Sequence, residues 1–175
     1  KFIEIENLNP SSLIEIHNRP LYLKQLTENL NRKFVFHYHN DPLTMNGSRL
    51  VKERIFMINN CEKIIFCSNW VKKRFLKNIN ENYINDDKFL IINHSINKKK
   101  INFNKKKKII TFVGRLNSAK GYDIFGKSII KILDKHKDWH AHVAGDEPRE
   151  KLEFNHERLI KHGFLNHDQI LKLYE

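Results

Sequence analysis

Two cations lie five residues apart between a predicted strand and a predicted helix. Arg115 follows the apolar, β-branched run 109–113 and Gly114, and Lys120 precedes Gly121, where a helix begins. Backbone N–H groups and the dipole of a helix N-terminus favour an anion, and arginine and lysine add charge-assisted hydrogen bonds. The segment lacks the Walker and G-x-G-x-x-G patterns. We predict a phosphate site here; the alternative is an ordinary strand–helix unit with two solvated cations.

Histidines end two other predicted strands. His17 ends the strand 13–17, and His39 ends the strand 33–39, with His37 two residues earlier on the same side. Neutral imidazole donates and accepts hydrogen bonds near neutral pH, which suits contact with a substrate hydroxyl. From position alone, however, the simpler interpretation of His39 is a strand-end histidine bonded to a neighbouring loop.

We predict no metal site. His140 and His142 alternate along the predicted strand 139–145 without further ligands nearby in the sequence, so we interpret them as strand-face residues. Cys61 and Cys67 are too few for a disulfide framework and lack a zinc-binding pattern. They are interpreted as buried thiols.

The elements that must position these residues alternate between strands and helices. The predicted strands are 13–17, 33–39, 63–67, 89–93, 109–114, 139–145 and 163–165, and the predicted helices are 21–30, 48–60, 68–76, 120–136, 150–161 and one from 167. This alternation implies an α/β fold with βαβ units and parallel sheets covered on both faces. Ligands of such folds bind beyond the carboxyl ends of strands, so we expect a cleft between two doubly wound lobes.

A basic run separates the two series of elements. The chain has 175 residues, a net charge of +12 and 40% hydrophobic residues, and much of the charge lies at 98–100 and 105–108. Such a run is usually a solvated linker, although it also suits anionic lipid or nucleic acid. Nucleic-acid binding favours aromatic residues among the basic ones, and this run contains only Phe103.

Four stretches in order resemble one family. The sequence FVGRLNSAKG at 112–121 resembles the Gly-Arg-Leu…Lys-Gly signature of retaining GT-B glycosyltransferases of family 4 (glycosyl transferases group 1). SNWVKKRF at 68–75, IINHSIN at 91–97 and AGDEP at 144–148 resemble further segments of that family, at similar spacing. The resemblance extends from about residue 13 to the end of the chain.

The resemblance implies a GT-B fold of two Rossmann-like, doubly wound lobes with mostly parallel sheets, both incomplete here. Residues 1–104 correspond to the C-terminal part of the acceptor-side lobe plus the basic linker, and residues 105–175 to the N-terminal part of the nucleotide-sugar lobe. The chain starts without methionine and stops before the Glu-x7-Glu segment of the family, so we expect an internal fragment that is inactive alone.

The resemblance also assigns the donor side. It implies that Arg115 and Lys120 hold the donor diphosphate and stabilise charge on the leaving nucleoside diphosphate, without a metal ion. Gly114, Gly145 and Phe164 correspond to the nucleotide-sugar pocket. The UDP- or GDP-linked sugar is then a substrate, and we expect no cofactor.

The same resemblance places His39 beside the donor sugar, as the candidate catalytic residue, and His17 on the acceptor side. Asp41 is interpreted as a turn residue. Glu147 departs from the glycine that is usual in the family, which puts the shape of its loop in doubt.

The function implied is transfer of a sugar from a nucleotide-diphosphate donor to a glycan or lipid-linked acceptor, with retention, in polysaccharide or lipopolysaccharide biosynthesis. We expect a cytoplasmic protein, at the inner face of the membrane if the basic run contacts anionic lipid, and no nucleic-acid partner. The alternatives are a non-catalytic basic module that binds nucleic-acid phosphates and a nucleotide-sugar enzyme of similar fold, such as an epimerase.

Overall fold

A computed structural model of the chain describes residues 1–84, 86–96 and 103–175. Its internal contacts divide the chain into two compact units, Lys1–Asn97 (unit 1) and Lys98–Glu175 (unit 2). The division falls at the start of the basic run. Residue 97 of the IINHSIN stretch and part of the basic run lie outside the described residues. The lipid contact predicted for that run therefore falls partly on residues that the structure does not describe.

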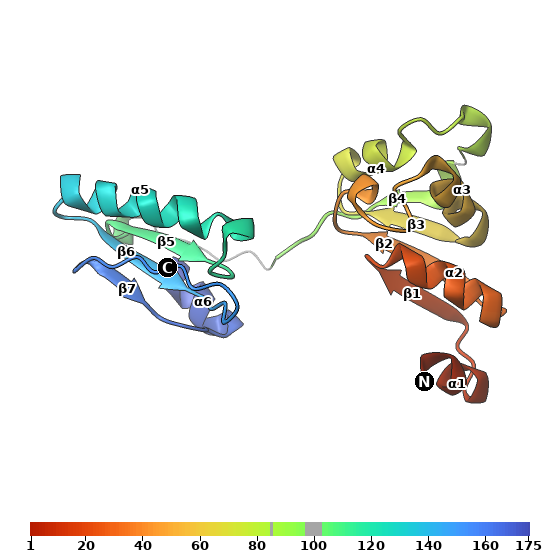
Figure 1. The fold of residues 1–175 in the computed structure, drawn as a ribbon, viewed down its shortest axis with the longest axis horizontal. Helices are drawn as coiled ribbons and strands as arrows, with labels where there is room; N and C mark the ends of the chain where they lie inside the picture. Colours follow the sequence, from red (N-terminus) through yellow and green to blue (C-terminus); the bar gives the residue numbers. More distant parts are fainter. Residues whose placement is uncertain (85, 97–102) are drawn as a thin grey trace. The chain divides into compact units, whose positions relative to one another are not determined.

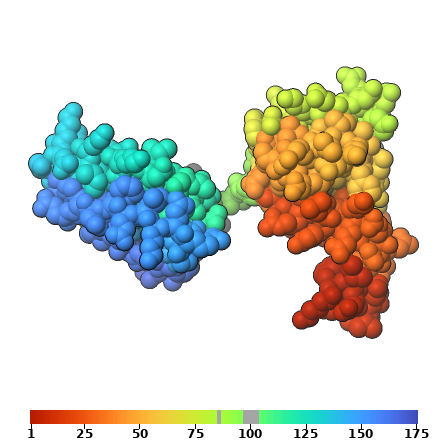
Figure 2. Space-filling view, in the orientation of Figure 1, coloured from red at the N-terminus to blue at the C-terminus, as the bar shows by residue number. Residues whose placement is uncertain are grey.

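Unit 1 is built on a parallel sheet of four strands in the order β1-β2-β3-β4 (Figure 1). Figure 2 shows that α1 projects from the rest of this unit. Its elements are α1 (Phe2–Leu8), β1 (Leu13–His17), α2 (Pro20–Asn29), β2 (Lys33–Tyr38), η1 (Pro42–Thr44), α3 (Val51–Asn60), β3 (Lys63–Phe66), α4 (Asn69–Leu76), η2 (Glu81–Tyr83), η3 (Asp86–Lys88) and β4 (Phe89–Ile91).

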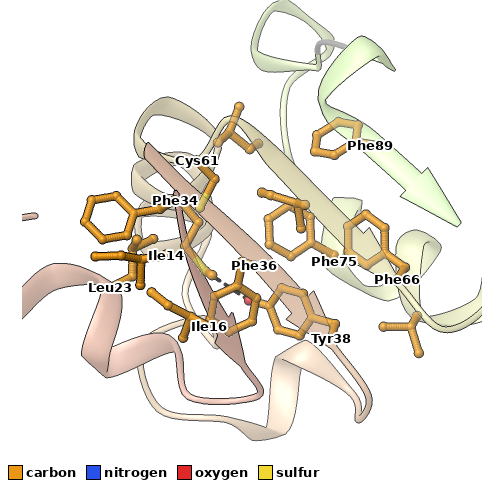
Figure 3. Close-up of a cluster of buried hydrophobic side chains, with 14 of the residues drawn as sticks. Ile14, Ile16, Leu23, Phe34, Phe36, Tyr38, Cys61, Phe66, Phe75 and Phe89 are labelled. Carbon is orange, nitrogen blue, oxygen red and sulfur yellow. Dashed lines mark hydrogen bonds between the residues drawn. The ribbon is translucent and has the colours of Figure 1, made fainter. Parts of the chain in front are cut away.

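One face of this sheet is the core of unit 1. Alternate strand residues point to it, and their rings pack tilted or edge to face around Phe75 of α4 (Figure 3). Phe36, Phe66 and Phe75 are fully buried, and each such side chain contributes about 1.5–3 kcal/mol. The other face presents Leu13, Glu15 and His17 to solvent. In the described part of unit 1, the prediction of a sheet covered on both faces is therefore wrong at β1.

Unit 2 has a parallel sheet of three strands in the order β5-β6-β7. Its elements are η4 (Phe103–Lys105), β5 (Ile109–Val113), η5 (Ser118–Lys120), α5 (Tyr122–Lys135), β6 (His140–Ala144), β7 (Leu159–Lys161) and α6 (His167–Tyr174). Ile110 and Phe112 pack in the core with α5, whereas Ile109 and Thr111 line the opposite face near α6. Helices therefore lie on both sides of this sheet, as the sequence predicts, and every residue of β5 is partly buried.

The prediction of a helix at 150–161 followed by a strand at 163–165 is wrong. Residues 151–156 have no regular structure, and the third strand of unit 2 is β7, at Leu159–Lys161. Leu152 and Phe154 pack on the core at alternate positions, and Phe154 lies against the space left by Gly126 of α5. Gly163 has a φ of +67°, a left-handed conformation that does not fit a strand.

Two predicted helix starts are confirmed. Ser68 Oγ accepts a hydrogen bond from the Val71 N–H at 3.3 Å at the start of α4. Asn166 Oδ1 accepts one from the Gln169 N–H at 3.0 Å at the start of α6. Side chains that cap exposed helix N-termini in this way typically contribute about 1 kcal/mol each.

Across the described ranges, every helix is either too short or too polar to cross a lipid bilayer.

Candidate functional site

In unit 2, the carboxyl ends of β5 and β6 meet at two glycines. Gly114 N–H donates to Ala144 O at 3.0 Å, and Gly145 N–H donates to Gly163 O at 2.7 Å. Gly145 has a φ of +136°, and a Cβ built on it would lie 1.8 Å from Gly114 O. Only glycine fits at position 145, and the two loops that follow these strands are therefore held in direct contact.

A pocket of about 180 Å³ opens beside this contact. Four of the residues predicted for the donor side lie in its wall: Gly114, Arg115, Gly145 and Phe164. Asp146, which the sequence analysis did not select, lines it too. The other lining residues are Val113, Ala144, Leu165 and Ile170.

Lys120, the fifth predicted donor-side residue, is exposed and does not line this pocket. Its segment is the short 3-10 helix η5, and the predicted start of a helix at Lys120 is replaced by a start at Tyr122. Asn117 Oδ1 accepts the Lys120 N–H at 3.1 Å, and Gly121 takes a left-handed φ of +75° before α5 begins. The backbone between the two cations is thereby fixed by Asn117.

Glu147 ties the Arg115 loop to the loop after β6. Its carboxylate, only 3% exposed, accepts hydrogen bonds from Arg149 Nε at 2.9 Å and Asn117 Nδ2 at 3.1 Å, and lies 4.0 Å from Arg115 Nη1. Hydrogen bonds from Arg149 and then Asn117 lower the pKa of Glu147 to about 2. The residue is therefore ionised at neutral pH. Sequence analysis noted it only as a departure from glycine, because its partner Asn117 is distant in the chain.

In unit 1, three histidines form a chain of ring contacts at the carboxyl ends of the strands. His17 Nδ1 lies 3.1 Å from His39 Nε2, and His39 Nδ1 lies 3.3 Å from His94 Nε2. β2 ends at Tyr38, so His39 is the first residue after the strand, and its N–H donates to Asn18 Oδ1 at 3.2 Å. His94 belongs to the IINHSIN stretch but was not selected as a site residue from sequence.

Burial shapes the protonation of these rings. Burial, followed by the charges of neighbouring histidines, lowers the pKa of His37 and of His39 below the usual 6.5. Both rings are therefore neutral at pH 7, and each offers one donor and one acceptor nitrogen. A small cavity of about 100 Å³ adjoins His37, His39 and His94.

Asp41 is a turn residue, as predicted. Its Oδ1 accepts the Leu43 N–H at 3.0 Å at the start of η1, and its Oδ2 accepts Arg74 Nη2 at 2.8 Å. The Arg74 guanidinium, together with the Leu43 N–H, lowers the pKa of the Asp41 carboxyl below 3.8.

We therefore expect an acid-dependent contribution from Asp41. Because its pKa is lowered in the folded state, its stabilisation is present above the unfolded pKa and is lost as the pH falls through the folded pKa. The melting temperature of unit 1 in the Asp41→Asn variant should lie below that of unit 1 in the wild type at neutral pH, and the gap should narrow as the pH falls below 3.8. Thermal unfolding from neutral to acidic pH tests this. The control is Glu28→Gln, which removes an exposed pair with Lys24 and should change little at any pH. A gap for Asp41→Asn that is the same at every pH would contradict the argument.

His140 and His142 both lie on β6, and His140 is exposed. His142 Nδ1 lies 3.2 Å from His162 Nε2. The predicted alternation of these residues along a strand is confirmed.

Comparison with solved structures identifies the class of fold. The chain is similar to TarM (12% identity, 97% of this chain and 36% of that chain, TM-score 0.63). It is also similar to Alr3699/HepE of Anabaena, solved with UDP-glucose (13% identity, 94% of this chain and 51% of that chain, TM-score 0.66). A third similar structure is the lipopolysaccharide outer core galactosyltransferase WaaB (12% identity, 99% of this chain and 50% of that chain, TM-score 0.57). At this identity the likeness establishes the fold, which is that of GT-B glycosyltransferases.

A family match covers the C-terminal part of the chain. Residues 93–175 match the family described as Glycosyl transferases group 1. The resemblance predicted from the four stretches is confirmed. No curated protein sequence matches the chain. The chain spans about a third to a half of the length of the solved structures given above.

Proposed function

We propose that the whole protein is a glycosyltransferase that moves a sugar from a nucleoside-diphosphate donor to a glycan or lipid-linked acceptor, with retention of the anomeric configuration. The observation that carries this proposal is the pocket at the ends of β5 and β6, in residues that match the group 1 family. Two of the similar structures support the proposal, since one was solved with UDP-glucose and the other is named a galactosyltransferase.

The chemistry of the pocket suits a donor diphosphate. Arg115 lines the pocket, and a guanidinium forms paired, charge-assisted hydrogen bonds with phosphate oxygens. Gly114 and Gly145 carry no side chain, so a ligand can approach their backbone. We assign Arg115 to stabilise the negative charge that grows on the nucleoside diphosphate as the glycosidic bond breaks, with Lys120 as a second, exposed cation. A bound metal ion is not required for this assignment.

The other assignments rest on unit 1. His39, neutral at pH 7, is proposed to donate a hydrogen bond to a hydroxyl of the donor sugar, and His17 to line the acceptor side. We propose a cytoplasmic location, where nucleotide sugars are available, and contact of the basic run with anionic lipid at the inner face of the membrane.

Calorimetry with UDP, GDP and ADP, without added metal, tests the donor site. The whole protein should bind one nucleotide preferentially, and Arg115→Ala combined with Lys120→Ala should weaken that binding at least about tenfold, since charge-assisted hydrogen bonds contribute about 1.5–3 kcal/mol. Lys127→Ala, which removes an exposed cation of α5, is the matched control and should bind as the wild type does.

Two results would overturn the proposal. One is a folded protein that binds none of the three nucleotides but binds DNA or RNA in a salt-sensitive manner, which would favour the basic-module alternative. The other is conversion of a nucleotide sugar without any acceptor, which would favour an epimerase. The anomeric configuration of the product, read by proton NMR, tests retention.

A further inference from the structure

Three potential metal ligands lie together on the solvent-facing side of the unit 1 sheet. β1 and β2 pair in parallel register with His17 opposite His37, and Glu15 lies two residues before His17. Residues two apart on a strand share a face, so the three side chains project from the same patch. The His17 and His37 rings stack with their centroids 4.2 Å apart.

The distances among the ligand atoms fit a single cation. Glu15 Oε2 lies 3.4 Å from His17 Nε2 and 3.5 Å from His37 Nε2, and one ligand atom from each residue falls within 4.8 Å of the others. Two ligands on a tetrahedral zinc ion at about 2.0–2.1 Å are separated by about 3.3–3.4 Å. The two separations that involve the carboxylate therefore match a tetrahedral site, and the two imidazole nitrogens lie within 4.8 Å of each other before any adjustment of the side chains.

One of these atoms lacks an ordinary partner. His37 Nε2 is buried and makes no hydrogen bond to a described residue, although Glu15 Oε2 lies 3.5 Å away. A buried nitrogen without a hydrogen bond costs free energy. Coordination of a cation by His37 Nε2 would remove that cost, because the nitrogen lone pair then has a partner.

The neighbouring histidines provide the second shell that such a site needs. A histidine that ligates through Nε2 carries its proton on Nδ1 and donates it to an acceptor, which fixes the ring. His17 Nδ1 faces His39 Nε2 at 3.1 Å, and His39 Nδ1 faces His94 Nε2 at 3.3 Å. One set of neutral tautomers satisfies both of these contacts: His17 Nδ1–H donates to His39 Nε2, and His39 Nδ1–H donates to His94 Nε2. It leaves the lone pair of His17 Nε2 facing the Glu15 carboxylate, where a cation would lie.

We propose that Glu15, His17 and His37 form a binding site for a divalent transition-metal ion of the Zn²⁺ class. Two imidazoles and one carboxylate are a donor set that zinc accepts, and the fourth position would remain open to water. The site is on unit 1, outside the donor pocket of unit 2, and it shares His17 with the proposed acceptor side. Sequence analysis predicted no metal site because His37 is twenty residues from His17 and joins it only through strand pairing.

The test uses Zn²⁺ titration by calorimetry and Co²⁺ titration by visible absorption on the whole, folded protein. We expect one high-affinity site and a Co²⁺ spectrum of a four-coordinate ion. Loss of an outer-shell partner of a ligating histidine costs about 10–100-fold in metal affinity, so His37→Asn and Glu15→Gln, which remove ligands, should each cost at least that much. Circular dichroism establishes that each variant is folded.

Two exposed or paired histidines of unit 2 supply the controls. His140→Asn and His142→Asn should leave Zn²⁺ binding unchanged. The proposal is overturned if the folded wild type takes up no Zn²⁺, if His37→Asn and Glu15→Gln bind Zn²⁺ as the wild type does, or if His142→Asn is the variant that loses it.

Discussion

Replacement of Gly145 by alanine is expected to destabilise unit 2 by about 3–5 kcal/mol. The new Cβ would lie 1.8 Å from Gly114 O, which is backbone and cannot rotate away, and the φ of +136° is itself unfavourable for any residue with a Cβ. The strand ends must separate to relieve the clash, and the wall of the pocket would separate with them. Native-state amide hydrogen exchange of β5 and β6 measures the effect, as a loss of protection.

Gly163→Ala is the matched control for this experiment. Gly163 also has a positive φ, +67°, but a Cβ there meets no atom within 4 Å. The control therefore carries only the cost of the left-handed conformation, roughly 1–2 kcal/mol. If the two variants lose equal protection, the close approach of Gly145 to Gly114 is not the reason that position 145 requires glycine.

Replacement of Arg115 by alanine is expected to lower kcat for sugar transfer by about 10²–10³, the loss typical when one preorganised donor to a developing charge is removed. This rests on the proposed function. The charge on the nucleoside diphosphate grows as the bond to the sugar breaks, so the interaction is stronger in the transition state than in the bound substrate. Steady-state kinetics with the donor identified by calorimetry would separate a change in kcat from a change in KM.

Lys120→Ala should have a smaller effect on kcat than Arg115→Ala, because Lys120 does not line the pocket. Lys127→Ala should have none. Equal losses for Arg115→Ala and Lys127→Ala would mean that the pocket does not hold the leaving group. Arg115→Lys should recover only part of the rate, since an ammonium cannot form the paired hydrogen bonds of a guanidinium.

Local patterns were sufficient to predict most of the fold. Short apolar, β-branched runs such as 109–113 form the strands, and the caps Ser68 and Asn166 lie where the sequence placed them. These signals are contained in a few neighbouring residues, and they do not depend on the rest of the chain. Local sequence was also sufficient to select Gly114, Arg115 and Gly145, which line the pocket, because each lies directly after a predicted strand or at its end.

Features that depend on distant residues were missed. Phe154 packs against Gly126 of α5, and residues 151–156 have no regular structure although their sequence suggested a helix. The link from Glu147 to Asn117 and the approach of His94 to His39 likewise join segments 30 and 55 residues apart. Sequence periodicity contains no information on such pairs.

The two hydrophobic clusters lie each within its own unit, and each unit contains one of the two tryptophans of the chain. Trp70 lies in the first turn of α4 and is exposed, whereas Trp139 packs against the hydrophobic cluster of unit 2. A single melting temperature is then not a well-defined property of this chain, because two cores have two unfolding equilibria. With either tryptophan replaced by phenylalanine, intrinsic fluorescence would follow the unfolding of one unit at a time and would assign any destabilising substitution to its unit.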